Sequence, residues 1–431
     1  MKRRGAILVM TLAVLTAVIA VLAGAAAMQQ LAFKAAINRT DRERARLMAE
    51  SGLQRALTSL ASQNPNATTQ NDEWFTLGTS GNDKFLLDDG SFRLQIVDAN
   101  SLVNLNTAAQ EQLLRLPLTE EQVESLLDWR TTGAQARPNG AKDSYYNQLA
   151  YPYNAAYKDL QSLDELMLIK GFTPATLYQT SQGGVSTATM VSSGTQQNQL
   201  TLYDLVTIDS ISSATNPQGR PKTNVNTATQ QQLQTAGIPA QIARNIITQR
   251  NRVRTFATLG DVLRVQGITT RNASTIIDSL IVNNNTPTGK LDLNTVTESI
   301  LNTIPNLPPD AIQGILQRQP QAGFRSVGEL ANVPGVTMSV LQQTADLFTT
   351  GSRSFIVRVV GAAGSATIPL EAVVTIDASS APATGSTVTT TASIGTVKMA
   401  KIYETPYTDM IPYWNWQADT TNEVDLTTGA R

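Results

Sequence analysis

The first 60 residues show one continuous helical pattern. Residues 6–28 are almost entirely apolar, and no charged side chain occurs between Arg4 and Lys34. A bilayer core about 30 Å thick requires roughly 20 apolar residues in a helix, so this run predicts a membrane-spanning segment. Three cations precede it, which predicts a cytoplasmic N-terminus and export of the remainder. Two alternatives are a secretory signal cleaved after residues 25–27 and a buried core helix.

Apolar positions continue beyond the spanning segment at helical spacing. Leu53, Ala56, Leu57 and Leu60 recur three and four residues apart, which is typical of a buried stripe. The sequence therefore predicts one long helix over residues 6–60, with its first half in lipid and its second half packed on a domain.

The period of two that is typical of strands appears in two further places. Phe92, Leu94 and Ile96 alternate with polar residues after an Asp89-Gly90 turn, and Phe355, Val357 and Val359 alternate with Ile356, Arg358 and Val360. We expect two hairpins, in residues 61–100 and 351–377, that share one antiparallel sheet, with residues 361–364 as the turn of the second. Residues 378–431 are expected to form a low-complexity linker and an aromatic tail. The alternatives for the tail are docking on a partner, folding onto the chain itself, and disorder.

Between the hairpins, residues 101–350 contain an internal repeat. Blocks at 103–130, 223–282 and 291–350 each begin with an apolar-Asn-apolar-Asn-Thr pattern or its Asp variant, followed by predicted helices. Asn106, Asn226 and Asn294 are expected to cap the helices that follow. The predicted fold class is α+β, with a helix packed on a small sheet and a large inserted all-α domain.

The amino-acid composition excludes several kinds of catalytic and metal site. The chain has 431 residues, a net charge of −1, no Cys and no His. Disulfides, thiolate chemistry, Ser-His-Asp triads and His-ligated zinc are therefore excluded. We predict a protein that is not an enzyme.

The N-terminus resembles those of type IV pilins and type II secretion pseudopilins, whose short basic leader ends in Gly. Here the leader is MKRRG, residues 1–5, followed by AILVM. The resemblance implies cleavage between Gly5 and Ala6 by a prepilin peptidase, and N-methylation of Ala6. Most members carry Glu at the fifth mature position, where this chain has Met10.

The segment between the first two repeats resembles the minor pseudopilin K family of type II secretion. The matching pieces are DWR, RPNGA, SYY, PY, LQSLDEL and IKGFTP, within residues 128–174. The resemblance implies an inner-membrane, single-pass subunit with its bulk in the periplasm, placed at the tip of the pseudopilus and helping its initiation. The implied partners are other minor pseudopilins, the major pseudopilin, the prepilin peptidase and the inner-membrane assembly platform.

Members of that family bind calcium in the inserted domain. Thr131, Thr132 and Lys142 stand where the family commonly has acids, and Asp128 and Asp143 remain as candidate ligands. A hard cation requires six to eight oxygen ligands. An alternative role for Asp128 is to hold Arg130 or Arg137.

The repeats also resemble helix-hairpin-helix units, with turns GIP, GIT and GVT that lack the second Gly. In DNA-binding members the backbone N–H groups of this turn meet a phosphate. A cluster of Arg250, Arg252 and Arg254 is the candidate nucleic-acid contact. The alternative function is therefore a membrane-tethered DNA receptor of the competence type, although packing modules are the favoured interpretation of the repeats.

Overall fold

The structure is a computed structural model that describes residues 3–64, 66–133, 135–179, 200–215, 219–285, 287–377, 396–404, 414, 416 and 422–427, with side chains from residue 9 onward. The polar loop 184–198, the linker 378–395 and the aromatic residues Tyr407 and Tyr413 lie outside the described residues.

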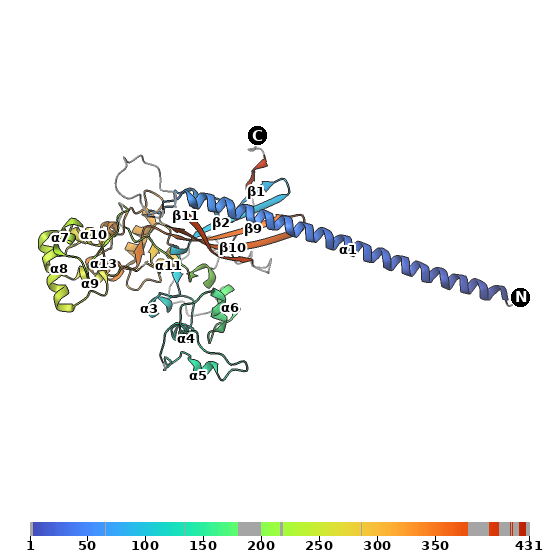
Figure 1. Cartoon of the computed structure of the whole chain (residues 1–431), viewed down its shortest axis with the longest axis horizontal. Helices are drawn as coiled ribbons and strands as arrows, with labels where there is room; N and C mark the ends of the chain where they lie inside the picture. The colour runs from blue at the N-terminus through green and yellow to red at the C-terminus, as the bar shows by residue number, and fades with distance from the viewer. Residues whose placement is uncertain are drawn as a thin grey trace.

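One helix, α1 (Arg3–Ala61), spans 59 residues and runs far beyond the rest of the molecule at its N-terminal end (Figure 1). It is long and apolar enough to cross a membrane: an 18-residue window has a mean hydropathy of 2.4 and none of that window is buried. Its second half lies on the sheet, where the buried stripe includes Ala45, Ala49, Leu53, Ala56 and Leu60. Small side chains at the start of this stripe allow close approach of helix and sheet.

The sheet has six strands in the order β11-β10-β9-β2-β1-β12. The strands are β1 (Asp83–Leu87), β2 (Gly90–Asp98), β9 (Ser354–Ala363), β10 (Ala366–Asp377), β11 (Thr396–Glu404) and β12 (Asn422–Asp425). β2 pairs antiparallel with β9, so the chain leaves the sheet near Asp98 and returns near Ser354. The α+β fold class is confirmed, and everything between these strands is an insertion.

The sheet differs from the expectation in two ways. The tail adds two strands to it, because β11 pairs antiparallel with β10 and β12 pairs parallel with β1, so the described part of the tail lies on the chain itself, which was one of the expected alternatives. These strands cover the edges of the two hairpins, which otherwise expose unpaired backbone groups. The predicted turn at residues 361–364 is also shorter than expected, because Gly361 belongs to β9 and lies against the backbone of α1 near Ala45 and Ala49.

The insertion consists of three units, each closed by a two-residue parallel ladder. β3 (Val103–Asn104) pairs with β4 (Val206–Thr207), β5 (Thr223–Asn224) with β6 (Leu280–Ile281), and β7 (Leu291–Asp292) with β8 (Phe348–Thr349). Each ladder joins the start of a unit to its end. The units share one continuous hydrophobic core, which is separate from the core between α1 and the sheet.

Short helices fill the units. The first contains α3 (Gln110–Leu113), α4 (Glu120–Arg130), α5 (Asp143–Tyr146), η3 (Leu163–Leu168), α6 (Pro174–Tyr178) and η4 (Leu202–Asp204). The second contains α7 (Gln230–Thr235), α8 (Ala240–Val253), α9 (Leu259–Leu263) and α10 (Thr270–Ser279). The third contains α11 (Glu298–Leu301), α12 (Pro309–Arg318), η5 (Val327–Asn332) and α13 (Met338–Thr344). The remaining short helices are α2 (Glu73–Thr76), η1 (Thr79–Gly81) and η2 (Ala99–Ser101).

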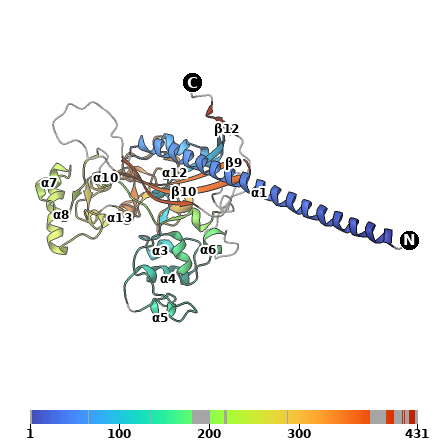
Figure 2. The same ribbon diagram turned by 45° about the vertical axis from the view of Figure 1, so that its right-hand side comes forward.

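The first unit is longer than its predicted span of 103–130. Its second half follows residue 160, where η3 and α6 occupy the place that α9 and α10 have in the second unit. A long loop after α4 separates the two halves and hides the repeat in the sequence. The units lie beyond and beside the sheet at the end of α1 farthest from the N-terminus (Figure 2).

Candidate functional site

The predicted processing residues lie at the start of α1. Gly5 and Ala6 belong to the first turns of this helix, which begins at Arg3, and only their backbone is described. Met10 is 72% exposed. The large apolar residues from Val9 to Ile37 are also exposed, so this half of α1 presents apolar surface in every direction. Such a surface is stable in lipid or against other helices.

The repeated Asn residues bridge chain segments and do not cap helices. Asn226 donates from Nδ2 to the carbonyl oxygens of Phe256 and Val282, both at 2.9 Å, and accepts the backbone N–H of Phe256 at 2.8 Å. Asn106 makes the corresponding bonds to Leu160 and Ile208 in the first unit. Asn294 makes the corresponding bonds to Phe324, but its other donor bond goes to the carbonyl oxygen of Thr68, which lies outside the insertion. The capping prediction is therefore wrong, because an amide with both donor and acceptor can tie the two halves of a unit together.

Of the arginine cluster, Arg250 faces inward. It donates from Nη1 to the carbonyl oxygens of Val225 and Ala228, both at 2.8 Å. Arg130 makes the equivalent bonds to the carbonyls of Leu105 and Ala108 in the first unit. Arg250 is therefore engaged in the fold, which argues against the predicted phosphate contact at this residue.

Arg252 and Arg254 are exposed at the C-terminal end of α8. Arg254 has φ of 72°, in the left-handed region, where it ends the helix. The two turn glycines of this unit, Gly237 and Gly267, also have positive φ, which explains their selection at these turns. The structure thus leaves two of the three predicted arginines on the surface.

The candidate calcium ligands lie in the first unit and have other partners. Asp128 is buried, and its Oδ1 lies 2.5 Å from Nη1 of Arg137 while its Oδ2 accepts the backbone N–H of Arg137 at 2.9 Å. Asp143 accepts the backbone N–H of Ala155 at 2.8 Å. No group of three or more acidic side chains suitable for a metal occurs among the described residues. Since both carboxylates already bind protein donors and one holds a guanidinium, these residues do not fit a calcium ion.

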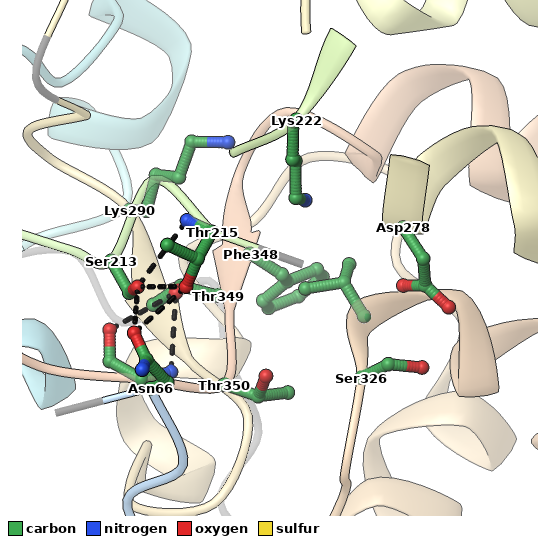
Figure 3. A pocket seen from close by; sticks show the side chains of 12 residues that line it. Asn66, Ser213, Thr215, Lys222, Asp278, Lys290, Ser326, Phe348, Thr349 and Thr350 are labelled. Carbon is green, nitrogen blue, oxygen red and sulfur yellow. Dashed lines mark hydrogen bonds between the residues drawn. The ribbon is translucent and has the colours of Figure 1, made fainter. Parts of the chain in front are cut away.

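A polar pocket lies where the second and third units meet. Figure 3 shows its lining, in which Lys222 and Lys290 approach from one side and Asp278 and Ser326 from another. Burial is the main cause that lowers the pKa of Lys222, to about 8, and the neighbouring charge of Lys290 adds to it. Burial likewise raises the pKa of Asp278 above its usual value. Nothing in the sequence pattern pointed to this pocket, because its residues come from several segments that are far apart in the chain, from Asn66 to Gly351.

A pair of buried carboxyl groups marks the junction between sheet and insertion. Asp98 at the end of β2 is 2% exposed, and Asp292 in β7 is fully buried. Burial raises the pKa of Asp98 to about 6 and, together with the charge of Asp98, raises that of Asp292 well above its usual value. The sequence did not predict this pair. It shows Asp292 only as the residue that replaces the first Asn of the repeat, and nothing in the pattern places it near Asp98.

Comparison with known proteins assigns two segments of the insertion. Residues 95–181 match the family of type II secretion system (T2SS) protein K, and residues 219–280 match the helix-hairpin-helix motif. No curated protein matches the chain. A solved chain of the GspK-GspI-GspJ complex from the type 2 secretion system of enterotoxigenic Escherichia coli is similar, with 14% identity and a TM-score of 0.45 over 86% of this chain and 98% of that chain.

The protein K match includes the DWR, RPNGA, SYY, PY, LQSLDEL and IKGFTP pieces, and the helix-hairpin-helix match coincides with the second unit. The resemblance to the type II secretion minor pseudopilin K family is therefore confirmed for the segment that carries its motifs.

Proposed function

We propose that this chain is a minor pseudopilin of a type II secretion machine or a related type IV pilus-like machine, anchored in the inner membrane and incorporated at the tip of the periplasmic pseudopilus. There it helps initiation of the pseudopilus and protein export. The observation that carries the proposal is the protein K segment at residues 95–181, inserted between two neighbouring strands of a sheet that packs on α1.

The exposed apolar half of α1 supports the anchor. Its N-terminal flank carries Lys2, Arg3 and Arg4, so the positive-inside rule favours a cytoplasmic N-terminus and a periplasmic bulk. Before processing, the helix holds the precursor in the membrane. After cleavage between Gly5 and Ala6, the same apolar surface packs against other pseudopilin helices.

The position of the insertion supports placement at the tip. The second unit (α7–α10) extends beyond the end of α1 farthest from the N-terminus, and the first unit (α3–α6) lies beside the sheet (Figure 1), so the insertion occupies the end where another subunit would otherwise stack. Met10 offers no carboxylate to the N-terminal amine of a neighbour. The subunit is thereby suited to begin a filament and not to be repeated within it. Its proposed partners are other minor pseudopilins, the major pseudopilin, the prepilin peptidase and the inner-membrane assembly platform, and its role is assembly without catalysis.

The mature N-terminus tests the proposal. Mass spectrometry of the full chain, expressed with and without a prepilin peptidase, is expected to show methylated Ala6 as the first residue only when the peptidase is present. Gly5→Leu should abolish cleavage. Gly24→Ala is the matched control, because a Cβ at Gly24 meets no atom within 4 Å. A mature start near residue 28, or an uncut chain in both strains, contradicts the proposal.

A DNA receptor is the second candidate, and the charge of the second unit favours it. Residues 219–282 contain eight Arg and Lys residues and only two Asp residues, a net charge of +6 in a chain whose total is −1. Fluorescence anisotropy with labelled duplex DNA over a range of salt concentrations tests this function. Binding at physiological salt that is lost on Arg252→Ala with Arg254→Ala supports it, since phosphate contacts give a steep salt dependence. The pseudopilin function predicts no such binding.

A further inference from the structure

We propose that the ammonium group of Lys142 is the built-in cation of the loop that follows α4, and that it takes the place of the calcium ion which the family resemblance implies there. The first unit then needs no metal to fold. This inference depends on the packing of residues 124–157 and is independent of the function proposed above.

The ammonium group is enclosed by acceptors. Lys142 is 4% exposed, and its Nζ donates to the carbonyl oxygen of Asp128 at 2.8 Å and to that of Thr131. Both carbonyls belong to the C-terminal end of α4, where carbonyl groups lack helical partners and the helix dipole is negative. The ring of Tyr157 covers another side, with its centroid 4.8 Å from Nζ. The site therefore stabilises a cation with oxygen atoms and an aromatic face.

The surrounding contacts join three segments that are otherwise separate. Asp143, next to Lys142, accepts the backbone N–H of Ala155, and the N–H of Tyr157 donates to the carbonyl of Trp129 at 2.8 Å. Tyr157 has φ of 51°, a left-handed conformation that tertiary contacts must maintain. Joining the end of α4, the start of α5 and residues 155–157 around one positive charge is the task that a structural cation performs.

The carboxylates close to the site already bind protein donors. The guanidinium of Arg137 neutralises Asp128, and Glu124 accepts the backbone N–H of Asn139 at 2.6 Å. A calcium ion would have to displace Lys142 from the carbonyls of Asp128 and Thr131, because two cations so close together repel strongly at a buried site. The ammonium and calcium are therefore alternatives, and the sequence of this chain encodes the ammonium.

Thermal unfolding and calcium binding of the purified full chain in detergent test the proposal. The wild-type chain should unfold at the same temperature in excess EDTA and in millimolar calcium chloride, and should bind no ⁴⁵Ca²⁺ in equilibrium dialysis. Lys142→Met should lower the unfolding temperature on the order of 10 °C in both buffers, because buried acceptors lose their cation. Lys158→Met, at an exposed position of the same unit, is the matched control and should change little.

Lys142→Asp reverses the charge and adds a carboxylate beside Asp128 and Asp143. This variant should unfold early in EDTA, regain stability in calcium and bind ⁴⁵Ca²⁺. The proposal is overturned if the wild-type chain loses stability in EDTA and recovers it in calcium, or if Lys142→Met unfolds like the wild type. Both of these results come from the wild type and Lys142→Met alone, so the test remains decisive even if Lys142→Asp does not fold.

Discussion

Asp98 and Asp292 place two buried carboxyl groups beside each other where the sheet meets the third unit of the insertion. Asp98 accepts the hydroxyl of Thr295 at 2.6 Å and the backbone N–H of Asn100 at 2.8 Å. Within the described part of the chain, Oδ2 of Asp292 has no hydrogen-bond partner. The negative charge of Asp72 also disfavours ionisation of Asp292 and so raises its pKa further. Ionisation of both groups is therefore unfavourable in the folded state.

The free energy of unfolding should fall as pH rises through this pair. Both carboxyl groups have a folded-state pKa above the unfolded value of about 4, so the folded state binds more protons than the unfolded state above that pH. Stability is then lost between about pH 4 and the folded pKa of Asp98, about 6, and falls further as Asp292 ionises.

Asp292→Asn should raise the unfolding free energy at neutral pH by up to about 3 kcal/mol and flatten its pH dependence, because the amide remains neutral and places no second charge near Asp98. Urea titrations across pH 4 to 8 measure both effects. Asp310→Asn, at an exposed site of α12, is the control. An unchanged pH slope in Asp292→Asn contradicts the assignment.

Asn294 should be irreplaceable by Asp, although the two side chains have the same shape. Its Nδ2 donates to the carbonyls of Thr68 at 2.8 Å and Phe324 at 2.9 Å. Asn294→Asp leaves both carbonyls without a donor and buries a charge, so we expect a loss of about 3 kcal/mol or more in urea unfolding. Asn302→Asp, which is exposed in the same unit, should change stability by about 0.5 kcal/mol or less. Equal losses in the two variants would rule out the bridging role.

The arginine cluster should divide into one structural and two surface residues. Arg250→Ala removes the donor from two carbonyls and should destabilise the second unit by about 2 to 4 kcal/mol. Arg252→Ala should stay within about 0.5 kcal/mol, because that side chain is exposed. Hydrogen exchange of α7 and α8 amides localises the effect. Destabilisation by Arg252→Ala as large as that by Arg250→Ala contradicts this division.

Sequence periodicity predicted the elements whose pattern is complete in the chain. In β2 buried residues recur at every second position from Phe92 onward, and the repeats share both spacing and residue type. The strand β9 is buried on both faces, which fits its nearly continuous apolar sequence. The predicted span of the first unit, 103–130, is too short because residues 131–159 separate its two halves. The sequence therefore does not show that Leu160 is the counterpart of Phe256. The common bond from the backbone N–H of each to Asn106 or Asn226 shows that they are equivalent.

Residues whose role depends on distant partners were not predictable. In the third unit, Gln319 donates to the carbonyls of Leu293 and Val296 and so replaces the arginine of the other units. The preceding Arg318 has the same spacing from Asn294 as Arg250 has from Asn226, but one extra residue in the turn shifts the register, and Arg318 pairs with Glu329. The strand β11 was also not predicted. Its apolar residues Met399 and Ile402 are exposed, and a register shift interrupts its pairing with β10. Its sequence therefore lacks the regular alternation that indicates a strand.

Trp416 should hold the C-terminal tail on the sheet. Its Nε1 donates to Oε1 of Gln95 at 2.9 Å, the guanidinium of Arg93 lies 5.2 Å from the ring centroid, and the ring lies against Gly81. Trp416→Ala removes a buried ring and should lower the free energy of unfolding by about 3 kcal/mol. Because β12 follows a few residues later and covers β1, the same change should also accelerate proteolysis of the tail.

Two matched variants separate the ring from its hydrogen bond. Trp416→Phe retains most of the contact with Gly81 and should lose about 1 kcal/mol, as should Gln95→Ala, which removes the acceptor. Limited proteolysis followed by mass spectrometry reports the release of residues after 404. If Trp416→Ala leaves the tail as resistant as in the wild type, the tail is held by β11 and β12 alone. In that case the aromatic residues of the tail have no part in closing the sheet, and their contacts with Gly81 and Gln95 follow from strand pairing.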